Sequence, residues 1–297
     1  MSGAKRVLTF VVGFNFVRYM RFTDGVAEVP ASIATAADNY DVFLESLARI
    51  VRQQRDPIDG IAFSFPGFVD VRRQVVTTSW ALRKLSGHRI GDDLNELLRS
   101  DIPVWMENDA NCVALAEKNR GNARRYDDFA LLTITDTGMG GALVLDGRLR
   151  RGRQWRAGEF GMFIPNHATA GLRTMHEYTS LDSIATRYAE RFGVPREGIV
   201  PASLLRRVDE PEVGELVRDW ASYVGAAIFN VIATIDPECV LVGGPVCQEM
   251  AFMPLIKEAV ESHPSWRDFR VPIKRCRYAS GAEFYGAYDA FMTEVGC

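Results

Sequence analysis

The sequence predicts an α/β protein of two lobes, and three observations favour this fold. Apolar segments of strand length alternate with segments of helical periodicity, which is typical of sheets that are at least partly parallel. A strand–turn–strand pattern over residues 6–22 returns over residues 129–149, so two related halves are expected. No low-complexity segment, charge block or flexible linker separates the halves, so we expect interwoven lobes rather than tethered ones.

The first half reads as strands alternating with helices. "RVLTFVVGFNFVRYMRF" (6–22) predicts two strands around a tight turn at Gly13, because an apolar run continues as an alternating pattern. Residues 38–54 carry apolar side chains at helical spacing behind Asp38, a candidate N-cap. The elements predicted next are a strand into the Pro66–Gly67 turn (58–70), a helix (90–100) and a strand (101–108).

The second half begins in the same way. Residues 129–149 predict a strand, a glycine turn and a second strand, which ends at an Asp146–Gly147 hairpin turn. A helical region is expected from about 177 to 230, with a break at "FGVPREGIVP". Residues 238–246 predict a buried strand that ends at paired glycines, and residues 282–295 predict a closing helix.

The composition is that of an ordinary globular protein and disfavours several classes. A net charge of −3 argues against nucleic acid as a partner. No apolar run reaches the ~18–20 residues of a membrane span, and the N-terminal segment lacks a signal-peptide layout. The five cysteines are scattered and never in C-x-x-C spacing, which favours reduced thiols over a disulfide frame or a zinc site. We therefore expect a cytoplasmic protein with no membrane partner.

Four polar residues stand at the end of a strand that reads as buried. They are Glu107, Asn108, Asp109 and Asn111, within "VWMENDANCVALAEKNRG". Left unpaired in apolar surroundings, such groups would cost several kcal/mol in total, roughly. Either internal hydrogen bonds or a bound ligand must satisfy them, and the residues alone leave both alternatives open.

Three other motifs also permit two interpretations. The glycine cluster "TDTGMGG" (135–141) could bring backbone N–H groups to an anion, or could be a hairpin turn that needs positive φ. "GGP" (243–245) lies at the carboxyl edge of a strand, where α/β sheets bind ligands, or it simply ends the strand. Glu159 and Glu177 each need a partner, and a ligand and an internal contact are equally acceptable.

The order of these motifs resembles the ROK family of sugar kinases and repressors. The matching segments, over about residues 5–292, are "PGFVD" (66–70), "ENDANCVALAE" (107–117), "DTGMGGALVLDGRLRRG" (136–152), "AGEFG" (157–161), "IDPECVLVGG" (235–244) and "YGA" (285–287). The resemblance implies a two-lobed actin/hexokinase-like ATPase fold, ribonuclease H-like, with mixed sheets and a cleft between the lobes. We expect an N-terminal lobe over 1–106, with the helix at about 282–297 packing back on it, and a C-terminal lobe over 107–281.

The resemblance also implies an activity. A ROK sugar kinase transfers a phosphoryl group from ATP with Mg²⁺ to a hydroxyl of a hexose or glucoside, and Asp109 stands at the general base. A homodimer and a small-molecule sugar as partner are expected. Sugar contacts are expected from Asn108, Glu159, Glu177 and Gly67, and nucleotide contacts from Gly13, Asn15, Thr137, Gly138, Gly140, Gly243 and Gly244.

One departure from the family pattern concerns zinc. Most members have a cysteine-rich loop and a histidine ligand after "GE-x-G", but here Met162 follows Gly161 and the next eighteen residues, roughly, contain no cysteine. No zinc site is therefore expected. The stretches "RYMRF" and "SWALRKLSG" resemble the zinc-lacking branch, which includes β-glucoside kinase-like proteins.

A second departure concerns the first phosphate loop, where the family reads Asp-x-Gly-Gly-Thr. The corresponding residues here are Val11, Val12, Gly13, Phe14 and Asn15. Val11 replaces a metal-associated carboxylate, and Phe14 opposes close phosphate approach through its side chain and its φ preference. Asn15 can still donate a hydrogen bond where Thr would, while Asp136 places negative charge in the second loop, where glycine is usual.

These replacements predict weakened ATP binding, because phosphoryl transfer depends on positioning and charge neutralisation. An alternative to the kinase is therefore a sugar-binding pseudokinase with weak or absent turnover, acting as a sensor or regulator. A third role, that of a transcriptional repressor, is not expected because only about five residues precede the first strand, too few for a DNA-binding helix pair.

Overall fold

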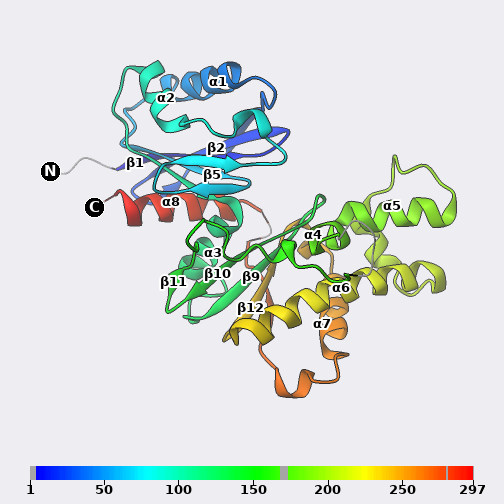
Figure 1. Cartoon of the computed structure of the whole chain (residues 1–297). Helices are drawn as coiled ribbons and strands as arrows, with labels where there is room; N and C mark the ends of the chain where they lie inside the picture. The colour runs from blue at the N-terminus through cyan, green and yellow to red at the C-terminus, as the bar shows by residue number, and fades with distance from the viewer. Residues whose placement is uncertain (1–4, 168–172, 279, 297) are drawn as a thin grey trace. The chain divides into compact units, whose positions relative to one another are not determined.

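The computed structural model describes residues 5–167, 173–278 and 280–296, and the chain forms two compact units (Figure 1). Unit 1 comprises Met1–Asn119, Gly152–Arg156 and Gly281–Cys297, and unit 2 comprises Arg120–Arg151 and Ala157–Ser280. The division falls later in the chain than the lobe boundary at 106/107 that we predicted. Helix α3 (Asp109–Arg120) accounts for the difference, because it starts at the end of a strand of unit 1 and packs within that unit.

Unit 1 is built on a six-stranded mixed sheet with the order β3-β2-β1-β5-β8, in which β4 also pairs with β2. Its strands are β1 (Arg6–Val12), β2 (Phe16–Thr23), β3 (Val26–Ala27), β4 (Ala31–Ala34), β5 (Gly60–Phe65) and β8 (Val104–Asn108). Strands β1 and β2 are antiparallel around the turn at Gly13, whereas β1, β5 and β8 are parallel. The strand pair predicted over residues 6–22 is confirmed.

Helices cover both faces of this sheet (Figure 1). Helices α1 (Tyr40–Arg52) and α2 (Ile90–Leu98) pack on the face that carries Leu8 and Phe10, and helix α8 (Ala282–Glu294) packs on the opposite face. A Cβ at Gly60 would lie 2.0 Å from the Phe291 ring, so α8 approaches the sheet closely. The unit also contains the hairpin β6 (Phe68–Asp70) and β7 (Val75–Thr78), and a 3-10 turn at Arg83–Leu85.

The N-cap of helix α1 lies one residue later than predicted. Asn39, not Asp38, is the N-cap, because Asn39 has extended φ and its side chain accepts a hydrogen bond from the Val42 amide at 3.1 Å. We expect Asn39→Ala to lower the free energy of unfolding by about 1 kcal/mol. The exposed Asp38 serves as the control, since Asp38→Ala should change stability by less than about 0.5 kcal/mol. Urea denaturation of both variants measures this, and equal losses would contradict the assignment.

Unit 2 is built on a five-stranded sheet with the order β11-β10-β9-β12-β13. Its strands are β9 (Phe129–Ile134), β10 (Met139–Leu145), β11 (Arg148–Leu149), β12 (Cys239–Gly243) and β13 (Ile273–Arg275). Asp146 and Gly147 both have positive φ between β10 and β11, as a two-residue hairpin turn requires. The repeat of the strand–turn–strand pattern in the second half is thus confirmed.

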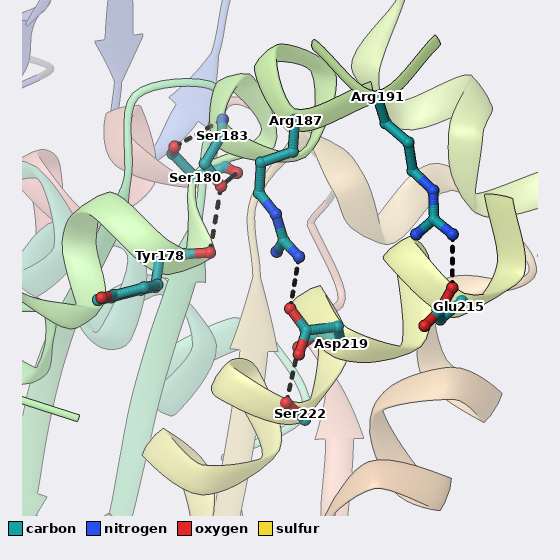
Figure 2. A network of polar contacts seen from close by, with 8 residues as sticks. All are labelled: Tyr178, Ser180, Ser183, Arg187, Arg191, Glu215, Asp219 and Ser222. Carbon is teal, nitrogen blue, oxygen red and sulfur yellow. Dashed lines mark hydrogen bonds and ion pairs between the residues drawn. The ribbon is translucent and has the colours of Figure 1, made fainter. Parts of the chain in front are cut away.

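The helices of unit 2 gather around the long helix α6 (Pro211–Ile235), which buries Trp220. The others are α4 (Met175–Thr179), α5 (Leu181–Phe192) and α7 (Phe252–Glu261), and 3-10 turns lie at Phe160–Met162, Pro201–Arg207, Pro245–Gln248 and Trp266–Asp268. Figure 2 shows α5 and α6 joined by ion pairs of Arg187 with Asp219 and of Arg191 with Glu215, both at 2.6 Å. No helix in the described part of the chain is long and apolar enough to cross a membrane.

Candidate functional site

The polar residues at the end of β8 bond mainly to one another. Glu107 is almost completely buried, and its Oε1 accepts hydrogen bonds from the Asn108 backbone N–H at 3.0 Å and from Asn111 Nδ2 at 2.9 Å. Asn108 Oδ1 accepts a hydrogen bond from the Asn111 backbone N–H at 3.0 Å. Internal hydrogen bonds therefore engage Glu107, Asn108 and Asn111, as the first of the two alternatives from the sequence requires.

In Asp109 one carboxylate oxygen is hydrogen-bonded and, within the described part of the chain, the other is not. Oδ1 accepts hydrogen bonds from Asn108 Nδ2 and from the Ala110 backbone N–H, both at 2.9 Å. Among the described residues, no group donates a hydrogen bond to Oδ2. The first residue of α3 thus holds a carboxylate in a fixed orientation and leaves one oxygen able to accept a proton.

The electrostatic setting of Asp109 favours proton transfer near neutral pH. Burial raises the pKa of Asp109 to about 6, and the negative charge of Glu283 on α8 acts in the same direction. The hydrogen bonds from Ala110 and Asn108 lower this pKa but do not cancel the effect of burial. At pH 7 Asp109 is mostly ionised yet more basic than an exposed aspartate, as suits a general base.

Asn108 also links Asp109 to the turn that follows β5. Its Nδ2 donates a hydrogen bond to the Gly67 carbonyl at 3.0 Å. Gly67 has φ +104°, and a Cβ there would lie 2.2 Å from the Thr78 carbonyl oxygen, so glycine is required. The structure thereby brings together three residues of unit 1 that the sequence assigned to sugar chemistry: Gly67, Asn108 and Asp109.

An aromatic pair that sequence reasoning missed follows Gly67 directly. The rings of Phe68 and Trp80 lie edge to face with centroids 5.2 Å apart, and the Arg156 guanidinium lies 5.1 Å from the Phe68 centroid. Phe68 is buried, whereas Trp80 is 55% exposed. A tryptophan in the short stretch "SWALRKLSG" was the available signal, but nothing in the sequence placed it beside the Gly67 turn.

The first predicted phosphate loop is the turn between β1 and β2. It is held by a hydrogen bond from the Gly13 N–H to the Phe16 carbonyl at 3.0 Å and by one from Thr35 Oγ1 to the Gly13 carbonyl at 2.8 Å. Phe14 is 61% exposed and does not have positive φ, and its predicted opposition to close phosphate approach stays a prediction. Asn15 is exposed in the same turn, whereas Val11 is buried against α8.

The second predicted phosphate loop lies between β9 and β10 in unit 2. The Gly138 N–H donates to Thr135 Oγ1 at 3.2 Å, and the Thr137 hydroxyl lies 3.3 Å from the same atom. A Cβ at Gly138 would lie 2.2 Å from the His176 ring. Glycine is needed at Gly138 for this close approach and not for positive φ, while Asp136 is exposed at the tip of the turn.

The remaining predicted contacts also lie in unit 2. Glu177 closes a capping box at the start of α4, because its Oε2 accepts a hydrogen bond from the Thr174 backbone N–H at 2.6 Å. Glu159 is partly buried where the 3-10 turn Phe160–Met162 begins. Gly244 has φ +102°, and a Cβ there would lie 2.0 Å from the Ile134 carbonyl oxygen, so β12 ends against β9. Gly243 is the last residue of β12, and Gly140 lies within β10 opposite Thr133.

The model of the ROK family matches residues 25–292. The chain belongs to the ROK family. The β-glucoside kinase of Klebsiella pneumoniae is 32% identical over 238 residues, which is 78% of each chain. The β-glucoside kinase of Listeria monocytogenes is also 32% identical, over 251 residues and 83% of each chain. Among solved structures, a ROK family protein from Streptococcus pneumoniae in complex with sucrose has 26% identity and a TM-score of 0.85, covering 97% of this chain and 98% of its own.

These comparisons confirm the predicted fold class of this ROK protein. A ROK glucokinase from Streptomyces griseus, with 21% identity and a TM-score of 0.78 over 97% of this chain and 99% of its own, supports the fold alone. The protein therefore has the hexokinase-like α/β fold of ROK sugar kinases. The two relatives at 32% identity carry the name of a sugar kinase, which supports a carbohydrate kinase.

The described residues offer little to a metal ion by themselves. They include no group of three or more His, Cys, Asp or Glu side chains that could hold one. Mg²⁺ commonly binds through substrate phosphates and water with only one or two protein carboxylates. The phosphates of a bound nucleotide would therefore have to supply most of the ligands of a Mg²⁺ ion at this site.

Proposed function

We propose that this ROK protein is an ATP-dependent kinase that phosphorylates a hydroxyl of a hexose or glucoside. Asp109 accepts the proton of the sugar hydroxyl as its oxygen attacks the γ-phosphoryl group. The observation that carries this proposal is the Asp109 carboxylate, with Oδ1 fixed by two hydrogen bonds and Oδ2 unbonded among the described residues. The kinase names of the curated relatives support the reaction class.

The other predicted residues receive roles within the same proposal. Asn108 orients Asp109, since its amide already bonds Asp109 Oδ1 and the Gly67 carbonyl. Asn108, Glu159, Glu177 and Gly67 contribute to sugar binding. The turns at Gly13–Asn15 and Thr137–Gly140, together with Gly243 and Gly244, bind ATP, and Mg²⁺ enters with the phosphates. We also propose that the enzyme works as a homodimer in the cytoplasm, a location that fits the described cysteines, which are buried as thiols rather than joined in disulfides.

The aromatic pair beside Gly67 supports a glucoside as the substrate. An exposed tryptophan that packs on a buried phenylalanine offers a flat apolar surface, and apolar surface beside polar sugar contacts is typical of ligand sites. The Gly67 carbonyl connects this surface to Asn108 and so to the general base. We place the second ring of a disaccharide glucoside, or an aryl aglycone, against Trp80.

Trp80→Ala should therefore separate glucosides from glucose. We expect the KM for a disaccharide glucoside to rise about 5–10-fold, the loss of roughly one aromatic stacking contact, while the KM for glucose stays within about twofold. Initial-rate kinetics with both sugars on both proteins measure the difference. An equal rise for glucose would show that Trp80 acts on the whole site, and no rise for either sugar would exclude it from substrate binding.

The alternative is a pseudokinase, favoured by the buried Val11 in place of a carboxylate and by the exposed Asp136 in the second loop. A coupled ADP assay over a panel of hexoses and disaccharide glucosides distinguishes the two functions, with calorimetry of the same sugars and of ATP. Sugar-dependent ADP formation that Asp109→Asn abolishes supports the kinase. Sugar binding without ADP formation from any member of the panel would support the pseudokinase instead.

A further inference from the structure

The carboxyl edge of the sheet in unit 1 carries a row of side chains on the face that α8 covers. In the strand register Arg18 of β2 pairs with Val11 of β1, Val11 pairs with Ser64 of β5, and Ser64 pairs with Glu107 of β8. Residues directly opposite one another in a sheet point to the same face. The Arg18 side chain therefore lies on the same face of the sheet as the buried Val11. Three strand spacings, about 14 Å, separate Arg18 from Glu107 along this row.

Arg18 is held at this edge by α8. Its Nη2 lies 3.3 Å from Glu283 Oε1, and its guanidinium carbon lies 5.4 Å from the centroid of the Phe284 ring. The hydrogen bond to Glu283 is the one that Arg18 makes in the described part of the chain, so most of its five N–H donors remain available. Arg18 has no carboxylate opposite it on β1, because the residue there is Val11.

The same helix brings Glu283 to the start of α3. A Cβ at Gly286 would lie 1.7 Å from the Cys112 carbonyl oxygen, so α8 and α3 touch backbone to backbone at these residues. Glu283 and Asp109 each precede this contact by three residues, about one helical turn, and both stand in the first turn of their helices. The negative charge of Glu283 contributes to the raised pKa of Asp109.

Glu283 thus bonds to Arg18, and its charge also acts on Asp109. Glu283 Oε2 is buried and has no hydrogen-bond partner among the described residues, so the pairing with Arg18 uses one oxygen only. A partly exposed ion pair with one hydrogen bond stabilises a fold little. Stability alone therefore does not explain why the Arg18–Glu283 ion pair lies near the general base.

We propose that Arg18 is a catalytic residue that contacts the terminal phosphoryl group of the nucleotide, and that Glu283 is the positioning residue that orients it. This inference rests on the proposed kinase function and adds a cation to its site. A guanidinium presents several N–H donors in a plane that matches phosphate oxygens, and it cannot lose its charge. Its fixed charge offsets that of Asp109 and Glu283, which would otherwise repel a polyphosphate at this edge.

The test compares Arg18→Met with Arg21→Met. Methionine keeps the apolar stem and removes the charge, and Arg21 lies on the same strand in an ion pair with Glu28 at 2.6 Å. Calorimetry with ATP and with adenosine, each in the presence of sugar, should show ATP affinity lowered about 10–100-fold in Arg18→Met with adenosine affinity unchanged. Arg21→Met should bind both ligands as the parent protein does. Arg18→Lys should recover part of the ATP affinity, and Glu283→Gln should lose roughly 3–10-fold of it.

Two results would overturn the inference: ATP affinity unchanged in Arg18→Met, or ATP and adenosine affinities lowered equally. The proposed function fails separately, if the parent protein makes no ADP with any sugar. In that case, ATP or inorganic tripolyphosphate binding that still depends on Arg18 supports the inference as a phosphate contact without turnover. If the parent protein binds neither anion, the inference fails together with the kinase.

Discussion

Asp109→Asn is expected to lower kcat for sugar phosphorylation by about 10²–10⁴-fold, the usual contribution of a general base. The amide oxygen of asparagine can still accept the hydrogen bonds that Oδ1 receives from Asn108 and Ala110, so the local fold is kept. What is lost is the basic oxygen, since an amide does not accept a proton near neutral pH. The KM for sugar and the affinity for ATP should change little, and initial-rate kinetics with calorimetry measure both.

The same substitution should stabilise the folded protein at neutral pH. The folded state holds the Asp109 proton up to about pH 6, whereas in the unfolded chain this carboxyl ionises near its ordinary pKa of 3.8. Stability contributed by the protonated carboxyl is therefore complete below about pH 4 and is lost as the pH rises to about 6. The stability of Asp109→Asn relative to the parent should therefore rise between about pH 4 and pH 6. Above about pH 6 the variant should be more stable than the parent by about 1–3 kcal/mol.

Chemical denaturation at several pH values from about 4 to 8 measures that difference. Glu197→Gln, at an exposed residue of unit 2, is the control for the loss of one negative charge. A parent protein as stable as Asp109→Asn at pH 8 would contradict the raised pKa. Full activity in Asp109→Asn would instead remove Asp109 from the chemistry while leaving the stability argument intact.

Local patterns in the sequence predicted most of the elements because those patterns have local causes. The alternation at residues 6–22, the Asp146–Gly147 turn and the closing helix depend on neighbouring residues, and the structure confirms all three. The cap of α1 was misplaced by one residue because Asp38 and Asn39 are both good caps, and only the backbone geometry selects Asn39. The turn at Phe14 does not use the positive φ that glycine would have permitted, so it differs from a turn with glycine at this position.

The sequence could predict only those residues of the candidate site that lie close together in the chain. The run Glu107–Asn111 showed that polar groups interrupt a buried strand, and the resemblance to the ROK family singled out Asp109. Arg18 and Glu283 could not be found this way, since the strand register and the packing of α8 bring them toward Asp109 from distant parts of the chain. A pattern of neighbouring residues cannot reveal that Val11 and Glu283, which are far apart in the sequence, lie at the same edge of the sheet.

Gly286→Ala is expected to destabilise unit 1 strongly, and more than Gly91→Ala does. The added Cβ would lie 1.7 Å from the Cys112 carbonyl oxygen and 2.3 Å from its carbon, and both are backbone atoms that cannot rotate away. Alanine favours a helix over glycine by about 1 kcal/mol, but separating α8 from α3 should cost more than this gain. The expected net loss in the free energy of unfolding is about 2–4 kcal/mol.

Gly91→Ala in α2 is the matched control within the same unit. There the new Cβ would meet only the Val104 side chain, at 3.0 Å, so a small shift can accommodate it and the stability should change by less than about 1 kcal/mol. Guanidinium denaturation of the two variants compares the losses. Because the contact at Gly286 also sets Glu283 beside Asp109, the surviving folded fraction of Gly286→Ala should lose ATP affinity, whereas Gly91→Ala should keep it. Unchanged stability in Gly286→Ala would mean that α3 and α8 can separate at this contact without cost, and the placement of Glu283 would then lack its structural basis.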